Sequence, residues 1–299
     1  MSKVKSLSVG NGDMCYIQHV SSNFTIIDCC LSDDNKETIV NELIKESKGK
    51  IIQRFISTHP DEDHIRQLDY LNKEMPILNF YCVKNDATKK DETPGYKTYR
   101  ALRDGDKAFY LFKGCSRKWM NESGPSADDT QIDSAGITIL WPEINNEHYI
   151  EALKTAKEGG SPNNISPIIK YSIKNGATFL WMGDLETDFM TNIEDKLELP
   201  KVNILFAPHH GRDSGKVPQS MLNDLNPDII VIGEAPSQEL NYYKSYNTIT
   251  QNTAGDITFV NNSDSIDIYV SKSEYQVGFL KNNNKQKLGD AYYLGTLHI

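Results

Sequence analysis

The sequence predicts a mixed α/β (α+β) fold, built as one domain with two mixed sheets and helices on their outer faces. Most apolar runs are short and rich in β-branched residues, and they alternate with period two or form continuous blocks, which is typical of strands. The order of strands in the first half of the chain is echoed in the second half. No composition break or Gly/Ser linker separates the halves, so residues 1–299 are assigned to a single domain.

The first half predicts strands followed by a helix, another strand and a polar loop. A helix is predicted over Lys36–Lys48, because apolar residues between Ile39 and Ile44 form one stripe. The strand that follows ends in the polar run His59–His64, and a second helical pattern comes after it. Ligand sites in open α/β sheets lie at the carboxyl ends of strands, which is where this loop falls. The strands predicted here are Val4–Val9, Met14–Val20, Phe24–Asp28 and Ile51–Ser57.

The second half predicts a similar alternation. Lys174–Ala177 is predicted as a hairpin turn, Asp188–Leu197 as a helix, and the last two strands as a terminal hairpin. The strands predicted here are Ile137–Trp141, Ile165–Ile173, Thr178–Met182, Val202–Ala207, Ile229–Ile232, Asp256–Val260 and Ser265–Val270.

Residues 84–158 are predicted as an insertion or flap between the two halves. Lys84–Lys118 carries ten basic and five acidic residues, with aromatic residues among them, although the whole chain has a net charge of −9. One interpretation is a solvated surface. The other is a flap that faces the substrate and offers phosphate contacts and stacking surfaces.

Composition restricts the classes of protein that this chain can belong to. A net charge of −9 argues against a protein that coats DNA by bulk charge. No run approaches the length of a membrane span, and the N-terminus leads directly into a strand pattern, so a cytoplasmic protein with no membrane partner is expected. The five cysteines form no C-x-x-C pair and are interpreted as reduced core residues.

Metal-binding side chains gather at His59-Pro-Asp61-Glu-Asp63-His64, directly after a predicted strand. Imidazole nitrogen and carboxylate oxygen are suitable ligands for Zn²⁺ or Mn²⁺. An acidic surface turn that happens to contain two histidines is the alternative interpretation.

Two further strand ends favour the metal interpretation. Gly183-Asp184 ends one predicted strand and His209-His210-Gly211 ends another. Four of the seven histidines therefore fall in two clusters at strand ends. His19, His148 and His298 are assigned no role.

Taken together, these motifs resemble the metallo-β-lactamase superfamily, and within it the hydrolase domain of the competence protein ComEC and its stand-alone relatives. Val9-Gly-Asn-Gly-Asp13 resembles the opening V-G-x-G-D turn of that family, and Ile26-Ile-Asp28 resembles its I-D motif. Ser57–His64 resembles the S-x-H-x-D-x-D-H loop. Asn164-x-Ser166, Gly183-Asp184 and His209-His210-Gly211-x-x-Ser214 then follow in the family's order. The resemblance implies a four-layer αβ/βα sandwich.

The resemblance also implies roles for individual residues. Asp28 would brace the metal loop, Asp63 would bind metal and orient the attacking water, and His209 would join catalysis or contact the substrate, with His210 favoured as the ligand. Asp61 stands where many members have histidine, and the third histidine expected near Asn164 is absent; oxygen ligands shift preference towards Mn²⁺ or Mg²⁺. The implied ligands of one or two divalent ions (Zn²⁺ or Mn²⁺) are His59, Asp61, Asp63, His64, Asp184 and His210, and the implied substrate-binding residues are Asn164, Ser166, Arg212, Ser214 and Lys216.

The leading functional prediction is a metal-dependent phosphodiesterase or nuclease that cleaves nucleic acid through a metal-activated water, because ComEC-like relatives are associated with DNA degradation. Two alternatives stay open. One is a hydrolase of the same fold that acts on a small molecule: a cyclic nucleotide, phosphonate, lactone or thioester. The other is a catalytically weak regulatory module.

Overall fold

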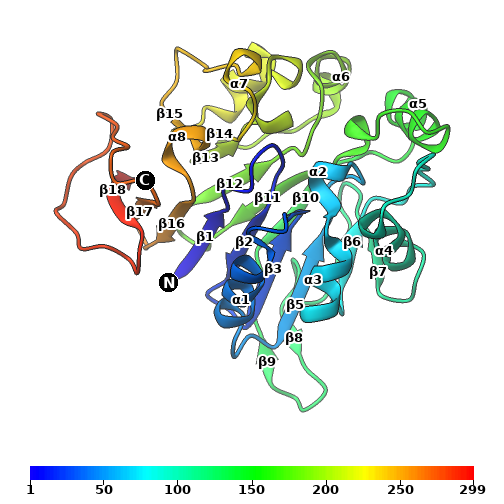
Figure 1. Ribbon diagram of the computed structural model, residues 1–299, viewed down its shortest axis with the longest axis horizontal. Coiled ribbons are helices and arrows are strands. Elements are labelled where there is room, and N and C mark those ends of the chain that lie inside the picture. The colour runs from blue at the N-terminus through cyan, green and yellow to red at the C-terminus, as the bar shows by residue number, and fades with distance from the viewer.

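The computed structural model describes residues 1–299 and contains two large mixed sheets with helices beside them (Figure 1). The nine-stranded sheet has the order β18-β17-β16-β1-β2-β3-β5-β6-β7, and the six-stranded sheet has the order β10-β11-β12-β13-β14-β15. The predicted α/β class with two mixed sheets and accompanying helices is therefore confirmed.

The bounds of the elements in the first sheet and beside it agree with most predictions to within a few residues. Its strands are β1 (Ser2–Ser6), β2 (Cys15–Gln18), β3 (Asn23–Ile27), β5 (Ile52–Ile56), β6 (Phe80–Cys82), β7 (Ala108–Tyr110), β16 (Ile257–Asn261), β17 (Ser265–Val270) and β18 (Tyr292–His298). The helices beside it are α1 (Lys36–Glu46), α2 (Glu62–Ile65), α3 (Leu68–Glu74) and α4 (Pro94–Arg103).

The elements of the second sheet include two predicted strands whose bounds match, β10 and β14. Its strands are β10 (Ile137–Trp141), β11 (Ile168–Ser172), β12 (Thr178–Trp181), β13 (Ile204–Phe206), β14 (Ile229–Ile232) and β15 (Thr248–Thr250). The helices in this half are α5 (Glu147–Lys157), α6 (Thr187–Ile193), α7 (Gln219–Leu225) and α8 (Gln251–Ala254), and a small hairpin pairs β8 (Gly124–Pro125) with β9 (Gln131–Ile132).

Two apolar cores result from the alternation of side chains along the first sheet. Ile17 and Ile27 point towards the second sheet and share one buried cluster with Ile169 and Phe179. Their neighbours on the opposite face, such as Phe24, pack in a second buried cluster with side chains of α1, α3 and α4. Apolar residues of α6 and α7 belong to the first cluster, so these helices pack on the second sheet.

The helical pattern after His64 forms two short helices where one was expected. The chain leaves helical geometry at Gln67, whose φ is +59°. The break has a tertiary cause. The short strand β4 (Cys29–Cys30) forms parallel β-bridges through its backbone to Ile65 and Arg66. The separate helix α2 therefore carries Asp63 and His64, and Asp61 is its N-cap residue.

Residues 84–158 contribute to both sheets. β7 is the edge strand of the first sheet, and β10 is the edge strand of the second. Several of the cations in this segment make internal contacts: Arg103 is buried against Asp104, and Arg100 pairs with Glu92. Much of the predicted flap is thus integrated in the fold.

The sequence did not predict the C-terminal strand β18, which pairs antiparallel with β17. All five cysteines are buried with free thiols. None of the helices combines the length and the apolar character that a membrane crossing requires.

Candidate metal centre

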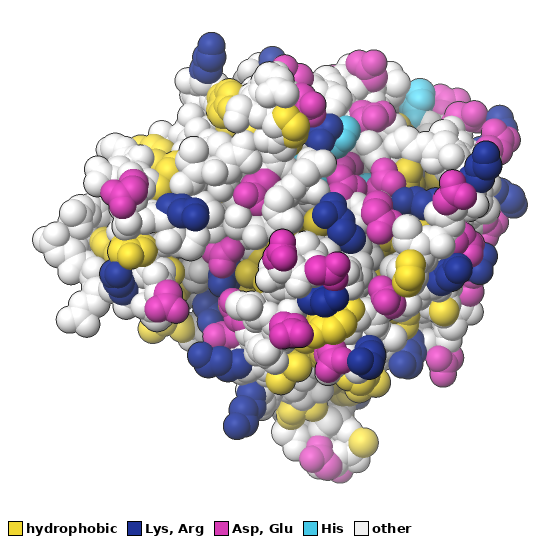
Figure 2. Space-filling view, in the orientation of Figure 1, with side chains coloured by type: hydrophobic (Ala, Val, Ile, Leu, Met, Phe, Trp, Pro, Cys, Tyr) yellow, Lys and Arg dark blue, Asp and Glu magenta, His cyan; other side chains and the backbone are white.

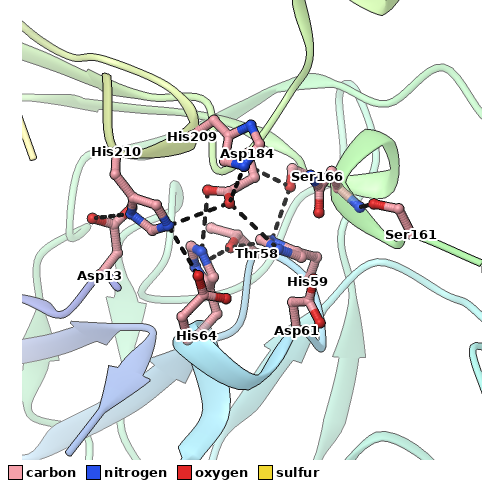
Figure 3. Close-up of polar contacts among 12 residues, drawn as sticks. Asp13, Thr58, His59, Asp61, His64, Ser161, Ser166, Asp184, His209 and His210 are labelled. Atoms are coloured by element: carbon pink, nitrogen blue, oxygen red, sulfur yellow. Dashed lines mark hydrogen bonds and ion pairs between the residues drawn. The ribbon is translucent and has the colours of Figure 1, made fainter. Parts of the chain in front are cut away.

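The predicted metal motifs meet at the carboxyl ends of β5, β12 and β13. His59 follows β5, Asp184 follows β12, and the pair His209-His210 follows β13. Figure 2 shows acidic side chains gathered over α2, with histidine exposed nearby. Side chains from the two sheets therefore converge on one point, as Figure 3 shows.

The carboxylate of Asp184 lies at the centre of four imidazoles. Nε2 of His64 is 3.1 Å from its Oδ1. The Nε2 atoms of His210, His209 and His59 lie 3.5, 3.8 and 3.9 Å from its Oδ2. His59, His64, His210 and Asp184 are almost completely buried. Four imidazole nitrogens face the same carboxylate, and this arrangement is suited to binding a cation.

The other nitrogen of each imidazole contacts a polar side chain, which holds the orientation of the ring. The Nδ1 contacts are His64 to Asp28 (2.9 Å), His210 to Asp13 (3.2 Å), His209 to Ser214 (3.0 Å), and His59 to Thr58 (3.1 Å) and Ser166 (3.2 Å). The Nε2 atoms of His59, His64 and His209 are thereby left for the centre, whereas Nε2 of His210 also lies 3.2 Å from Oδ2 of Asp63.

Asp28 is positioned by a local feature of the backbone. Its φ is +58°, an uncommon conformation for a residue other than glycine. Its carboxylate accepts hydrogen bonds from the backbone N–H (2.8 Å) and the hydroxyl (2.7 Å) of Thr58. The chain turn after β3 is thus tied to the metal loop.

Buried atoms without hydrogen-bond partners test whether these residues fit a metal ion. Nε2 of His59 is buried and makes no hydrogen bond, while Nε2 of His64 and Oδ1 of Asp184 are buried and lie 3.1 Å apart without hydrogen-bond geometry. An unpartnered buried polar atom costs about 1–3 kcal/mol, and a coordinated cation would satisfy all three. One ligand atom from each of Asp13, His64, Asp184 and His210 lies within 4.8 Å of the others, so this group could hold a metal ion.

Electrostatics couple the buried carboxylates to the imidazoles. Burial opposes protonation of His64, but the carboxylates of Asp184 and Asp28 raise its pKa well above the usual value. His210 behaves in the same way, and Asp184 and Asp13 raise its pKa to about 10 against the effect of burial. Burial also works against ionisation of Asp184, yet the neighbouring imidazoles lower its pKa well below the usual value.

The remaining two imidazoles are driven towards the neutral form. Burial, together with the charge of His64, lowers the pKa of His59 to about 3. Burial also lowers the pKa of His209. Neutral imidazole is the form that ligates metal ions.

Two of the expected ligands lie at the edge of the cluster or outside it. Oδ2 of Asp63 is 3.2 Å from Nε2 of His210, and its side chain is partly exposed at the mouth of the site. Asp61 points away: its Oδ1 lies 2.8 Å from Nζ of Lys89 and accepts a hydrogen bond from the first N–H of α2. The carboxylate that was expected to bind metal is instead paired with the Lys89 ammonium and caps the N-terminus of α2.

The expected substrate-binding residues take several positions. Ser166 lies inside the site, where its hydroxyl accepts a hydrogen bond from the backbone N–H of Asp184. Asn164 is bonded to Glu186, and Arg212 contacts Asn11 and Glu239. The remaining two are Ser214, which contacts His209, and Lys216, whose side chain is exposed.

Asp13 is the site residue to which sequence reasoning gave no role. Gly12 brings it there: a Cβ at Gly12 would lie 2.3 Å from Sγ of Cys30 and 2.5 Å from the carbonyl oxygen of Asp63. The turn therefore packs directly on α2, and the backbone N–H of Asp13 donates to that same carbonyl (3.1 Å). The sequence signal was a Gly-x-Gly-Asp turn after a strand, but its approach to α2 is a tertiary contact.

Comparison with known proteins identifies no family: no family model matches the chain, and no curated protein matches it.

Proposed function

We propose that this chain is a metal-dependent hydrolase of the metallo-β-lactamase superfamily, of the ComEC-like type, and that it cleaves phosphodiester bonds of nucleic acid. The observation that carries the proposal is the ring of four imidazole Nε2 atoms around the Asp184 carboxylate. Two large sheets with a shared core and helices beside them are compatible with the four-layer αβ/βα sandwich of that superfamily.

His64, His210 and Asp184 would hold a divalent ion, Zn²⁺ or Mn²⁺, and the Asp13 carboxylate beside Nδ1 of His210 would orient that ring. When bound, such an ion supplies a Lewis acid that polarises a phosphoryl oxygen and makes water nucleophilic at neutral pH. Asp28 holds the His64 ring in place through Nδ1, so that Nε2 stays directed at the centre.

In this proposal two side chains at the mouth of the site act on the water and the substrate. Asp63 is partly exposed beside His210, and its ionised carboxylate can accept a hydrogen bond from a water and orient it. His209 is also partly exposed, and Ser214 fixes its ring with Nε2 towards the same space. In this proposal His209 contacts the phosphoryl group or the leaving oxygen.

A small phosphorylated molecule is a second candidate substrate, because a separate pocket of about 390 Å³ adjoins the metal loop. Its lining includes Asp61, Lys89, Lys90 and Ser161. Its volume falls within the range of small-molecule sites, about 300–1,000 Å³.

The proposal is tested by removing metal from the purified protein, reloading it with Zn²⁺ or Mn²⁺, and measuring both metal content and hydrolysis. The substrates are DNA, RNA, a cyclic nucleotide and bis(4-nitrophenyl) phosphate. We expect stoichiometric binding and phosphodiester cleavage, both lost in His64→Ala and Asp184→Asn. His19→Gln, which removes a buried imidazole outside the site, is the matched control and should retain both. A wild-type protein that takes up no metal, or that cleaves no phosphodiester when loaded, would contradict the proposal.

A further inference from the structure

A groove of about 470 Å³ lies beside the turn that carries His209 and His210. Its walls are the start of α7, the loop before it, and the chain between β14 and β15, which lie together at the top of Figure 1. Three tyrosines occur within five residues here, at Tyr242, Tyr243 and Tyr246. We call this the tyrosine groove.

The tyrosine groove is bonded directly to the metal-centre turn. The backbone N–H of Asn241 donates to the carbonyl of Gly211 (2.8 Å), and Gly211 follows His210. The side-chain amide of Asn241 donates a hydrogen bond to the carboxylate of Asp213 (3.0 Å), so this carboxylate already has a partner within the chain. The wall of the groove is therefore fixed to the turn that carries His209 and His210.

The backbone at Tyr243 is strained, and the side chain of the preceding residue, Tyr242, lies at the surface. Tyr243 has a φ of +42°, which costs about 1–3 kcal/mol for a bulky residue, and its ring is buried. Asn241 holds the turn, because its Oδ1 accepts a hydrogen bond from the N–H of Tyr243 (2.9 Å). The side chain of Tyr242 is left at the surface, 40% exposed, and its hydroxyl donates to the carbonyl of Ser237 (3.2 Å). Strain of this kind is typical of ligand clamps.

The groove also carries two cations without partners. Lys216 and Lys244 line it, both are exposed, and neither ammonium forms an ion pair or a hydrogen bond within the chain. Many other surface lysines, such as Lys89 and Lys113, are paired with carboxylates. In a chain with a net charge of −9, unpaired cations beside exposed tyrosine favour an anionic ligand with aromatic rings.

We propose that the tyrosine groove binds unpaired nucleotides, so that the substrate is a single-stranded nucleic acid; this inference rests on the proposed function. Bases stack on Tyr242 and on Tyr246, whose hydroxyl is held by Gln219 (2.9 Å). Phosphates of the same strand pair with Lys216 and Lys244. A base can offer a face to a tyrosine ring only when it is not stacked between its neighbours, as it is in a duplex, so duplex substrates are disfavoured.

The test measures binding of fluorescein-labelled 12-nucleotide oligo(dT), oligo(rU) and a blunt duplex by fluorescence anisotropy in EDTA, where metal-dependent cleavage cannot occur. Wild-type protein should bind the single strands more tightly than the duplex. Tyr242→Ala should raise the single-strand Kd at least about fivefold, since stacking on one aromatic ring contributes that much or more. Tyr242→Phe should restore the affinity, and Lys244→Ala should lower the slope of log Kd against log salt by about 0.7.

Ile44→Ala is the matched control, because Ile44 is about as exposed (44%) as Tyr242 (40%) and lies on α1, outside the groove. It should bind like wild type. Equal affinity for duplex and single strands, or an unchanged Kd in Tyr242→Ala, would overturn the inference.

Hydrolysis of bis(4-nitrophenyl) phosphate by metal-loaded protein separates the two proposals. Cleavage of this small diester without single-strand binding overturns the groove and leaves the hydrolase. Single-strand binding that depends on Tyr242, with no cleavage of any diester by loaded protein, supports the groove and overturns the proposed function.

Discussion

Oδ2 of Asp28 lies 2.9 Å from Nδ1 of His64, and Nε2 of the same ring lies 3.1 Å from Asp184. One imidazole thus joins a buried carboxylate at the end of β3 to the central carboxylate after β12. Asp13 and His210 repeat this relationship from the opposite side of the centre. The two carboxylate–imidazole pairs orient two Nε2 atoms towards the same carboxylate, which is the basis of the first prediction.

Asp28→Asn should weaken binding of Zn²⁺ or Mn²⁺ by about 10- to 100-fold, because a carboxylate that orients a ligating imidazole contributes about that much to metal affinity. The substitution keeps the size of the side chain and removes its charge. Titration calorimetry on metal-free protein gives the affinity. Asp290→Asn, at an exposed position in the loop before β18, is the control. An affinity of Asp28→Asn equal to that of the control would show that Asp28 has no part in the metal site.

Asp61→Ala should leave metal affinity within about threefold of wild type, in contrast to the sequence expectation of a ligand. Its carboxylate pairs with Lys89 and caps α2, so its loss should instead lower the free energy of unfolding by about 1 kcal/mol. Asp61→Ser retains a capping oxygen and should recover most of that stability. Urea unfolding and calorimetry report the two quantities separately. A loss of affinity as large as that of His64→Ala would place Asp61 among the ligands after all.

Gly12→Ala should disturb both stability and metal binding. The added Cβ would meet the carbonyl oxygen of Asp63, a backbone atom that can move only with α2. Overpacking of this kind costs about 1–3 kcal/mol, and here it displaces Asp13 and Asp63 together. Gly10→Ala is the matched control: its φ is +82°, but no atom lies within 4 Å of the added Cβ. Gly10→Ala should therefore lose some stability to backbone strain and keep the wild-type metal affinity. Equal metal affinity in both variants would contradict the packing argument.

Local pattern was sufficient for much of the fold, and it placed several candidate site residues at strand ends. The predicted bounds of Ile137–Trp141, Ile229–Ile232 and Ser265–Val270 agree with the strands, because each is a compact run of β-forming residues between turn signals. Local pattern put Asp184 and His210 at the ends of predicted strands, and the family resemblance implied their roles as ligands; the structure pairs these two strands side by side in one sheet.

Long-range contacts account for what the sequence did not predict. The carboxylate of Asp61 pairs with the ammonium of Lys89, which lies 28 residues further along the chain. Asp13 reaches His210 only because the turn at Gly12 packs against α2. The helix after His64 is interrupted where Ile65 and Arg66 form β-bridges to Cys29 and Cys30, and the helical periodicity of the sequence does not predict these contacts. Each of these depends on a partner that is distant in sequence.

His19 should make folding stability dependent on pH, independently of the metal centre. The ring is buried, Nε2 lies 2.8 Å from the hydroxyl of Thr25, and its edge packs against Tyr171. Burial, and then the positive charge of Arg54 and Lys50, lowers the pKa of His19 well below 6.5. The folded protein therefore keeps this ring neutral where the unfolded chain would protonate it.

Because the unfolded state binds more protons below about pH 6.5, the contribution of His19 is present above that pH and is lost as pH falls. The loss approaches about 1.4 kcal/mol per pH unit, so the wild-type protein should lose about 1 kcal/mol from this ring between pH 7.5 and pH 5.5. His19→Gln removes the titrating group. Urea unfolding in EDTA at both pH values should therefore show the stability difference between variant and wild type shrinking by about that amount at low pH. His148→Gln, on the exposed face of α5, controls for removal of a surface histidine. A difference between wild type and His19→Gln that is constant with pH would mean that His19 accepts its proton equally in the folded and unfolded states.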